Sequence, residues 1–170
     1  ARHGFIAKSL LNSLIQKKIF EKKEVDSFEQ NLNTITAQML NDSTQVKSKG
    51  INKKKFMKKY GHLRPGTYDI SSRRYDQMKN FKFNVRRKKT KPFYLSKEEE
   101  RNINKLLKKN GFNLNSDQFL DYIKSSLILR EYSKFVFTKY LSLILEIIAK
   151  FGQKKKNHPP LMYWRAKSGF

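Results

Sequence analysis

The stretch that decides the fold lies late in the sequence and reads NSDQFLDYIKSSLILREYSKFVFTKYLSLILEIIAKF over residues 115–151. Either Asn115 or Ser116 suits the N-cap position of one very long helix that reaches about Phe151. Residues 135–148 are apolar on most sides, so we expect neighbouring elements to bury this part of the helix. The predicted class is therefore all-α: an irregular helical bundle with one long C-terminal helix and a Pro-Gly loop insertion.

Earlier parts of the sequence repeat apolar residues at the three- and four-residue steps of helices. One such pattern runs from His3 to Phe20, with Ile6, Leu10 and Leu14 on its apolar stripe. A second continues from near Lys23 to Met39, and a short connection at residues 21–23 predicts an antiparallel pair. Two further helices are expected near residues 51–60 and 96–110, with a polar stretch at 41–50 between the earlier elements.

Local turn and capping signals mark the ends of these segments. Gly61 suits a left-handed cap after the short basic helix, and Arg64-Pro65-Gly66-Thr67 has the composition of a type II turn. Ser96 and Glu99 have the spacing of a capping box, and Gly111 ends that helix. Alternation at residues 81–85 indicates an extended segment. The domain expected from these signals covers residues 1–152, and residues 153–170 read as a basic tail or connection.

Composition restricts the function classes. The 170 residues carry 38 Lys and Arg against 14 Asp and Glu, a formal net charge of +24. With 38% hydrophobic residues, the chain is expected to fold rather than stay disordered. No apolar run is long enough for a membrane span, and the absence of cysteine excludes disulfides and thiolate zinc sites. These features fit a cytoplasmic protein.

The positive charge is concentrated between Lys47 and Lys91, where 17 basic residues face only Asp69 and Asp76. A surface of this kind fits a phosphate-bearing partner, nucleic acid included. Because 29 of the basic residues are Lys and 9 are Arg, readout of base edges is less favoured. Compositional drift toward Lys and Asn at permissive surface sites is the alternative explanation.

Two constellations are candidate binding sites. The first is the loop YGHLRPGTYDI, residues 60–70, in which Pro65 and Gly66 restrict the backbone. Such a loop would hold its polar side chains rigidly enough to bind a polar ligand; these are His62, Arg64, Tyr68 and Asp69. The alternative is an ordinary structural loop.

The second constellation lies in the long helix, where Arg130, Lys134 and Thr138 fall four residues apart on one face. Charged groups between apolar flanks need partners. The face is therefore either a surface stripe or the lining of a polar cavity with an anionic or amide ligand on Arg130 and Lys134. No metal-ligand spacing joins the three histidines, so no metal site is predicted.

Three segments resemble the central region of phosphoenolpyruvate-synthase-like phosphotransferases: ARHGFIA (residues 1–7), YGHLRPGTYDI (60–70) and REYSKFVFT (130–138). That family includes pyruvate, water dikinase, rifampin phosphotransferase and the glutamine kinases of surface-polysaccharide gene clusters. The resemblance covers roughly residues 1–152. It implies a helical platform that binds a small-molecule acceptor and is visited by a phosphohistidine charged by ATP. The substrate-binding residues would be His62, Arg64, Tyr68, Asp69, Arg130 and Lys134.

Family members of this kind carry an ATP-grasp domain before this region and a swivelling phosphohistidine domain after it. The resemblance implies that both lie outside this sequence, so the chain alone is expected to be inactive. ATP and magnesium would serve the complete enzyme, with no cofactor in this chain. Many relatives read Gly-His-Arg-Gly-Pro-Gly-Glu where this chain has GHLRPGT at residues 61–67, which predicts an acceptor other than a rifamycin. A basic helical nucleic-acid-binding module remains the competing hypothesis, and an isolated, partly unfolded fragment is the third.

Overall fold

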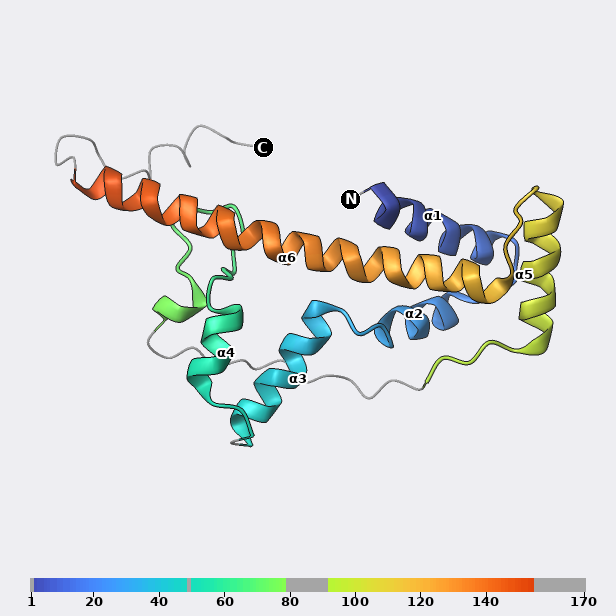
Figure 1. Cartoon of the computed structure of the whole chain (residues 1–170), viewed down its shortest axis with the longest axis horizontal. Coiled ribbons are helices and arrows are strands. Elements are labelled where there is room, and N and C mark those ends of the chain that lie inside the picture. The colour runs from blue at the N-terminus through green and yellow to red at the C-terminus, as the bar shows by residue number, and fades with distance from the viewer. Residues whose placement is uncertain (1, 49, 79–91, 155–170) are drawn as a thin grey trace. The chain divides into compact units, whose positions relative to one another are not determined.

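The computed structural model describes residues 2–48, 50–78 and 92–154, and within them the chain is all-α (Figure 1). The helices are α1 (Arg2–Gln16), α2 (Lys22–Gln30), α3 (Ile35–Lys47), α4 (Lys53–Tyr60), α5 (Lys97–Lys109) and α6 (Ser116–Lys154), with a 3₁₀ turn η1 (Tyr75–Gln77). The chain divides into two compact units, residues 1–38 with 86–133 and residues 39–85 with 134–170. The all-α prediction with a long C-terminal helix is confirmed.

The first unit has an apolar core supplied by α1, α2, α5 and the first half of α6. Its fully or almost fully buried side chains include Ala7, Leu11, Leu14, Phe28, Ile103, Leu107, Ile123 and Leu127. Phe93 packs edge-on against Phe20 and Phe28, with ring centroids 5.7 and 5.2 Å apart. Lys8 of α1 forms an ion pair with Glu29 of α2. Because the connection between the two helices is short, this pair is consistent with the predicted antiparallel arrangement.

The buried stripe of α1 differs from the predicted one. Gly4, Ala7, Leu11 and Leu14 face the core, whereas Ile6 is 47% exposed. Small residues at the first two positions allow a neighbour to approach closely: a Cβ at Gly4 would lie 2.9 Å from the Cβ of Arg130. The side of α1 that carries Gly4 and Ala7 is therefore buried, because it permits closer packing than the more hydrophobic side that carries Ile6.

The helix predicted to run from near Lys23 to Met39 is two helices. The Asn31 side-chain amide donates to the Ser27 carbonyl at 2.8 Å, and the Thr34 hydroxyl accepts from the Ala37 amide at 3.2 Å. Short polar side chains of this kind bind the backbone and end or begin helices. The apolar register survives the break, since Val25, Phe28, Leu32 and Ile35 are all buried. The expected polar stretch at 41–50 is also largely helical, because α3 extends to Lys47.

The capping predictions for α5 and α6 are confirmed. Ser96 Oγ accepts from the Glu99 amide at 3.2 Å, and the Glu99 carboxylate accepts from the Ser96 amide at 2.6 Å. Gly111, beyond the end of α5, has a φ of +76°, a conformation that glycine adopts without steric cost. Asn115 caps α6, since its side-chain oxygen accepts from the Gln118 amide at 2.8 Å.

In the second unit, α6 does not follow the expectation of burial for residues 135–148. Thr138 and Ser142 are buried, whereas Tyr140, Ile144 and Ile147 are 61%, 52% and 58% exposed. The apolar side of this half-helix therefore faces solvent, and its buried side carries hydroxyl groups. The predicted extended segment at 81–85 and the tail from residue 155 onward lie outside the described residues.

Candidate functional site

The site belongs to the second unit and is built on the segment from α4 to η1. The Asn52 side chain caps α4 by accepting from the Lys54 amide at 2.8 Å, and Phe56 and Tyr60 turn into the unit interior. The Tyr60 hydroxyl donates to Asp42 of α3 at 2.8 Å. These contacts fix the point at which the loop of residues 61–78 begins.

Gly61 does not form the predicted left-handed cap. Its φ is −60°, and its amide donates to the Met57 carbonyl at 2.7 Å. Glycine is required here by a close approach instead, since a Cβ would lie 2.8 Å from the Cβ of Asp76. The loop returns on itself at this point, with the Asp76 amide donating to the Gly61 carbonyl at 3.1 Å and the Tyr75 amide to the Leu63 carbonyl at 2.9 Å.

The predicted type II turn at residues 64–67 is also wrong. Such a turn needs a positive φ at Gly66, and Gly111 is the one glycine with a positive φ among the described residues. The hydrogen-bonded turns lie further along: the Asp69 amide donates to the Gly66 carbonyl, and the Ser72 amide to the Asp69 carbonyl, both at 3.1 Å. A Cβ at Gly66 would lie 2.9 Å from the Cβ of Asp69, so the glycine is needed for this tight fold of the loop.

Arg64 joins the loop to α6. The side chain is only 8% exposed, and it donates from Nε to Ser142 Oγ at 2.9 Å and from Nη2 to the Ser142 carbonyl at 3.0 Å. Nη1 donates to the Ser72 carbonyl at 2.8 Å. Desolvation lowers the pKa of Arg64 from its ordinary value, but an arginine remains charged at any physiological pH. The planar fork therefore serves acceptors of the protein itself, which positions the loop on the helix.

Arg74 makes a second connection between the loop and α6. Its Nη1 lies 2.6 Å from Glu146 Oε2, and its Nε donates to Asp76 Oδ1 at 3.0 Å. Glu146 also pairs with Lys150 at 2.8 Å. Sequence reasoning missed Arg74, Glu146 and Ser142; the one available signal was the presence of Ser142 and Glu146 in an otherwise apolar stretch of the long helix.

His62 lies under this loop with one nitrogen atom unsatisfied. The residue is 7% exposed, and its ring packs edge-on against Phe135, with 4.8 Å between centroids. Nε2 is buried and has no hydrogen-bond partner among the described residues. Buried polar atoms are almost always hydrogen-bonded, so an exception needs an explanation.

Burial lowers the pKa of His62 from its ordinary value of 6.5, because desolvation disfavours the imidazolium form. A hydrogen bond to the Phe135 backbone acts in the opposite direction, and the charges of Lys139 and Arg74 lower the pKa further, each more strongly than Asp76 raises it. At neutral pH the ring is therefore uncharged. Since Nε2 has no partner in the described part of the chain, the bond to the Phe135 backbone uses Nδ1, which leaves Nε2 as an acceptor in a positive local field.

Tyr68 and Asp69 lie at the exposed tip of the loop. Tyr68 is 70% exposed. Asp69 is also exposed, and its Oδ1 accepts from the Ser71 amide at 2.9 Å and from the Ser71 hydroxyl at 2.6 Å. This arrangement stabilises the turn while leaving the Tyr68 phenol accessible to a ligand.

The predicted helix residues lie in different surroundings. Arg130 belongs to the first unit, where its guanidinium carbon is 4.9 Å from the centroid of the Phe5 ring, a cation–π contact. Lys134 is exposed and belongs to the second unit. Thr138 is buried and donates to the Phe135 carbonyl at 2.9 Å. The convergence of Arg130 with the loop residues stays a prediction.

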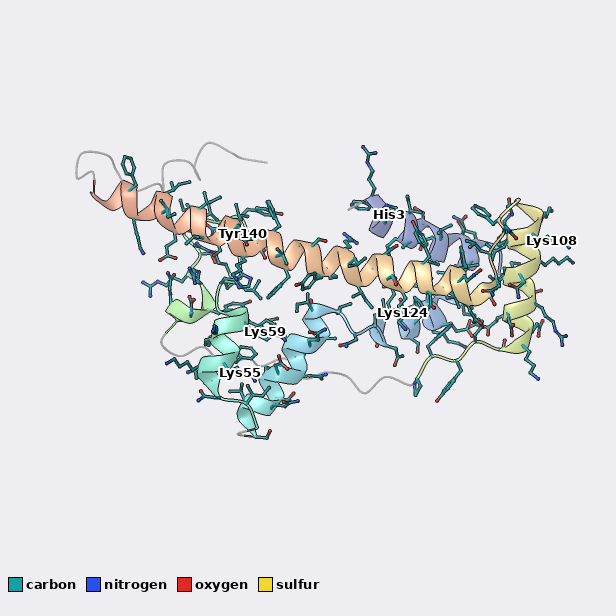
Figure 2. All side chains as sticks on the ribbon, in the orientation of Figure 1. His3, Lys55, Lys59, Lys108, Lys124 and Tyr140 are labelled. Atoms are coloured by element: carbon teal, nitrogen blue, oxygen red, sulfur yellow. The ribbon has the colours of Figure 1, made fainter. Side chains whose placement is uncertain are left out.

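A separate cationic surface covers α4. Its five lysines, Lys53, Lys54, Lys55, Lys58 and Lys59, are all exposed. Lys59 pairs with Asp42 at 3.2 Å. Figure 2 shows the Lys55 and Lys59 side chains projecting from this helix. The α4 lysine surface is thus formed by all the exposed positions of this helix.

Among the described residues, no three His, Cys, Asp or Glu side chains come close enough together to hold a metal ion. Within the same residues, no helix has the length and hydropathy that crossing a membrane requires. Comparison with known proteins found no matching protein family, no curated relative and no similar solved structure.

Proposed function

We propose that this chain supplies the acceptor-binding platform of an ATP-dependent phosphotransferase of the phosphoenolpyruvate-synthase-like kind. The proposal rests on the resemblance of the YGHLRPGTYDI segment and, above all, on His62. A neutral imidazole, whose buried Nε2 has no partner among the described residues, lies in a loop that two arginines attach to α6. A binding group held this way loses little freedom when a ligand arrives.

In this proposal His62 Nε2 accepts a hydrogen bond from the N–H or O–H group of the acceptor. The phosphoryl group breaks its bond to the donor histidine of another domain and forms a bond to the acceptor atom, whose proton passes to Nε2. Lys139 and Arg74, which make the field at the ring positive, favour the incoming anion. Positioning and positive charge are the main requirements of phosphoryl transfer.

The remaining residues have supporting roles in the proposal. Tyr68 and Asp69, at the exposed loop tip, contact the acceptor. Arg64, whose donors are occupied by Ser142 and Ser72, positions the loop. Arg130 and Lys134 contribute electrostatic stabilisation. The ATP-grasp and phosphohistidine domains would be partners of this platform.

The test is a titration of the full chain with inorganic phosphate, in which NMR monitors the resonances of the imidazole nitrogens. The chain has three histidines, and His62→Gln and His3→Gln variants assign two of them. We expect a saturable shift of the His62 Nε2 signal with little change at His3, and a weaker response in Lys139→Ala. Equal small shifts at all three histidines would show a bulk ionic effect and would contradict the proposal.

Nucleic-acid binding is the second candidate, and the α4 lysine surface is the observation that favours it. Lysines on most of a helix circumference can neutralise several phosphates, and such binding weakens steeply with salt. We propose that Lys54→Ala/Lys58→Ala weakens binding of a single-stranded RNA and a DNA duplex and reduces the salt slope by about 2. The matched control is Lys108→Ala/Lys109→Ala on α5. Equal losses in both pairs would indicate non-specific attraction to a basic protein and would exclude a dedicated surface.

A further inference from the structure

The second half of α6 has its polar and apolar sides reversed relative to an ordinary surface helix. Thr138 and Ser142 are buried, and Glu146 is tied to Arg74. The opposite side is apolar and exposed. We call this side the outer apolar face; it comprises Val136, Phe137, Tyr140, Leu143, Ile144, Ile147 and Ile148, which are 37–61% exposed.

The spacing of these residues has the pattern of a helix packed against other helices. Val136, Tyr140, Leu143 and Ile147 follow steps of four, three and four residues, the repeat of a helix–helix seam. Phe137, Ile144 and Ile148 widen the seam on one side. At about 100° per residue the seven positions span about 140° of the circumference, which is the width of an apolar stripe buried in a bundle rather than in a two-stranded coil.

A continuous apolar face of this kind marks an interaction surface. It is about 18 Å long from Val136 to Ile148 at about 1.5 Å per residue. Tyr140 lies near its middle, and Figure 2 shows where this residue lies along α6. Burial of these side chains is favourable against a partner surface that is itself largely apolar.

Charge indicates the chemistry of that partner. Each acidic residue of the second unit's described part is engaged within the unit: Asp42 with Lys59, Asp76 with Arg74, Asp69 with Ser71, and Glu146 with Arg74 and Lys150. Lys134 and Lys139, at the two margins of the outer apolar face, are exposed and form no ion pair with the described residues. Carboxylates are therefore the complementary groups at the edges of this face.

We propose that the outer apolar face binds an amphipathic helix with acidic flanks from a protein partner. A second copy of this chain would bring together two chains of net charge +24, with Lys139 of each copy at the margin of the contact. A lipid surface supplies acceptors for the Tyr140 hydroxyl only at its headgroups, whereas this residue lies near the middle of the face. A helical partner buries the same residues and offers a carboxylate or carbonyl to that hydroxyl.

The probe is a designed 22-residue helical peptide with leucines at seam positions and glutamates on both flanks, titrated into the full chain by calorimetry. A peptide of identical composition with its apolar positions scrambled controls for attraction to a basic protein. We expect saturable binding of the patterned peptide at micromolar concentration and at least tenfold weaker binding of the scrambled one. Equal affinity for the two peptides, or no binding of either, would overturn the proposal.

Variants locate the binding. Leu143→Glu should weaken binding of the patterned peptide at least tenfold. The matched control is Leu114→Glu, at a residue that is 44% exposed and lies outside this face, and it should leave the affinity unchanged. Lys139→Glu should weaken binding of the patterned peptide about threefold and reduce the dependence of this binding on salt concentration. Circular dichroism checks that the variants keep their helix content.

Two further measurements separate the other occupants. Sedimentation of the chain alone tests for a dimer, and co-sedimentation with phosphatidylserine-containing vesicles tests for lipid binding. A concentration-dependent dimer that Leu143→Glu dissociates would assign the face to a second copy. Vesicle binding that the same variant abolishes, without peptide binding, would assign it to a membrane surface. Either result would refute a helical partner.

Discussion

Replacing Arg64 by alanine should destabilise the second unit, because it removes the attachment of the loop to α6. The variant removes three hydrogen bonds of 2.8–3.0 Å from a charged donor, two to Ser142 and one to the Ser72 carbonyl, and a longer one of 3.5 Å to the Ile70 carbonyl. Each bond of this kind contributes about 1.5 kcal/mol or more. Release of the ordered side chain returns about 2 kcal/mol of conformational entropy.

The free energy of unfolding should therefore fall by about 2–3 kcal/mol, and the melting temperature by about 5–10 °C for a chain of this size. Thermal melting followed by circular dichroism measures the shift. Hydrogen exchange supplies a local readout, because the Tyr75 and Asp76 amides bond to the Leu63 and Gly61 carbonyls. Both amides should exchange faster when the loop loses its attachment to α6.

Two matched variants test the reasoning. Arg73→Ala removes a neighbouring arginine that is exposed, so its unfolding free energy should change by less than about 0.5 kcal/mol. Arg64→Lys keeps the charge but not the planar fork, and should lie between wild type and Arg64→Ala. If Arg64→Ala melts within a degree of wild type, with unchanged exchange at Tyr75, the argument that Arg64 attaches the loop is wrong.

Three other outcomes follow from the structure. Gly61→Ala should lower the free energy of unfolding by about 1–3 kcal/mol through overpacking. The control is Gly50→Ala, where a Cβ would meet nothing closer than 3.6 Å, and its thermal melting should change little. Ser96→Ala removes the N-cap of α5 and should lower the free energy of unfolding by about 1 kcal/mol. An unchanged melting temperature would show that the capping box contributes nothing to stability. Because the pKa of His62 is lowered in the folded state, the unfolded state binds more protons below pH 6.5. The stability that the neutral His62 contributes is complete above that pH and is lost as the pH falls toward the folded pKa. The melting temperature of wild type should therefore fall more between pH 7.5 and 5 than the melting temperature of His62→Gln. The control variant His3→Gln should behave as wild type.

Local signals in the sequence were sufficient where the interacting groups are neighbours along the chain. The capping box of Ser96 and Glu99, the cap at Asn115 and the left-handed Gly111 are all present in the structure. Each depends on atoms within a few residues, so the residue types alone determine the geometry. The helical class followed from apolar periodicity for the same reason.

The candidate site was only partly predictable. His62, Arg64, Tyr68 and Asp69 were predicted from the loop composition, but the loop's turns lie elsewhere than at residues 64–67. Arg74 and its partner Glu146 carried no local signal, because they are 72 residues apart in sequence. Pairing between a loop and a distant helix depends on which face of that helix the loop meets.

The sequence by itself determined the helical class, the caps of α5 and α6 and the positive charge of this protein, because backbone hydrogen bonding and periodicity are local properties. Only the tertiary structure decided which side of α1 and of the second half of α6 is buried. In α1 the side with small residues is buried and Ile6 is exposed. In α6 Thr138 and Ser142 are buried, and the outer apolar face is exposed. Burial depends on which distant groups can satisfy a side chain. Here the Arg64 guanidinium satisfies Ser142, whereas hydropathy alone predicted that neighbouring elements bury the apolar residues of this half-helix.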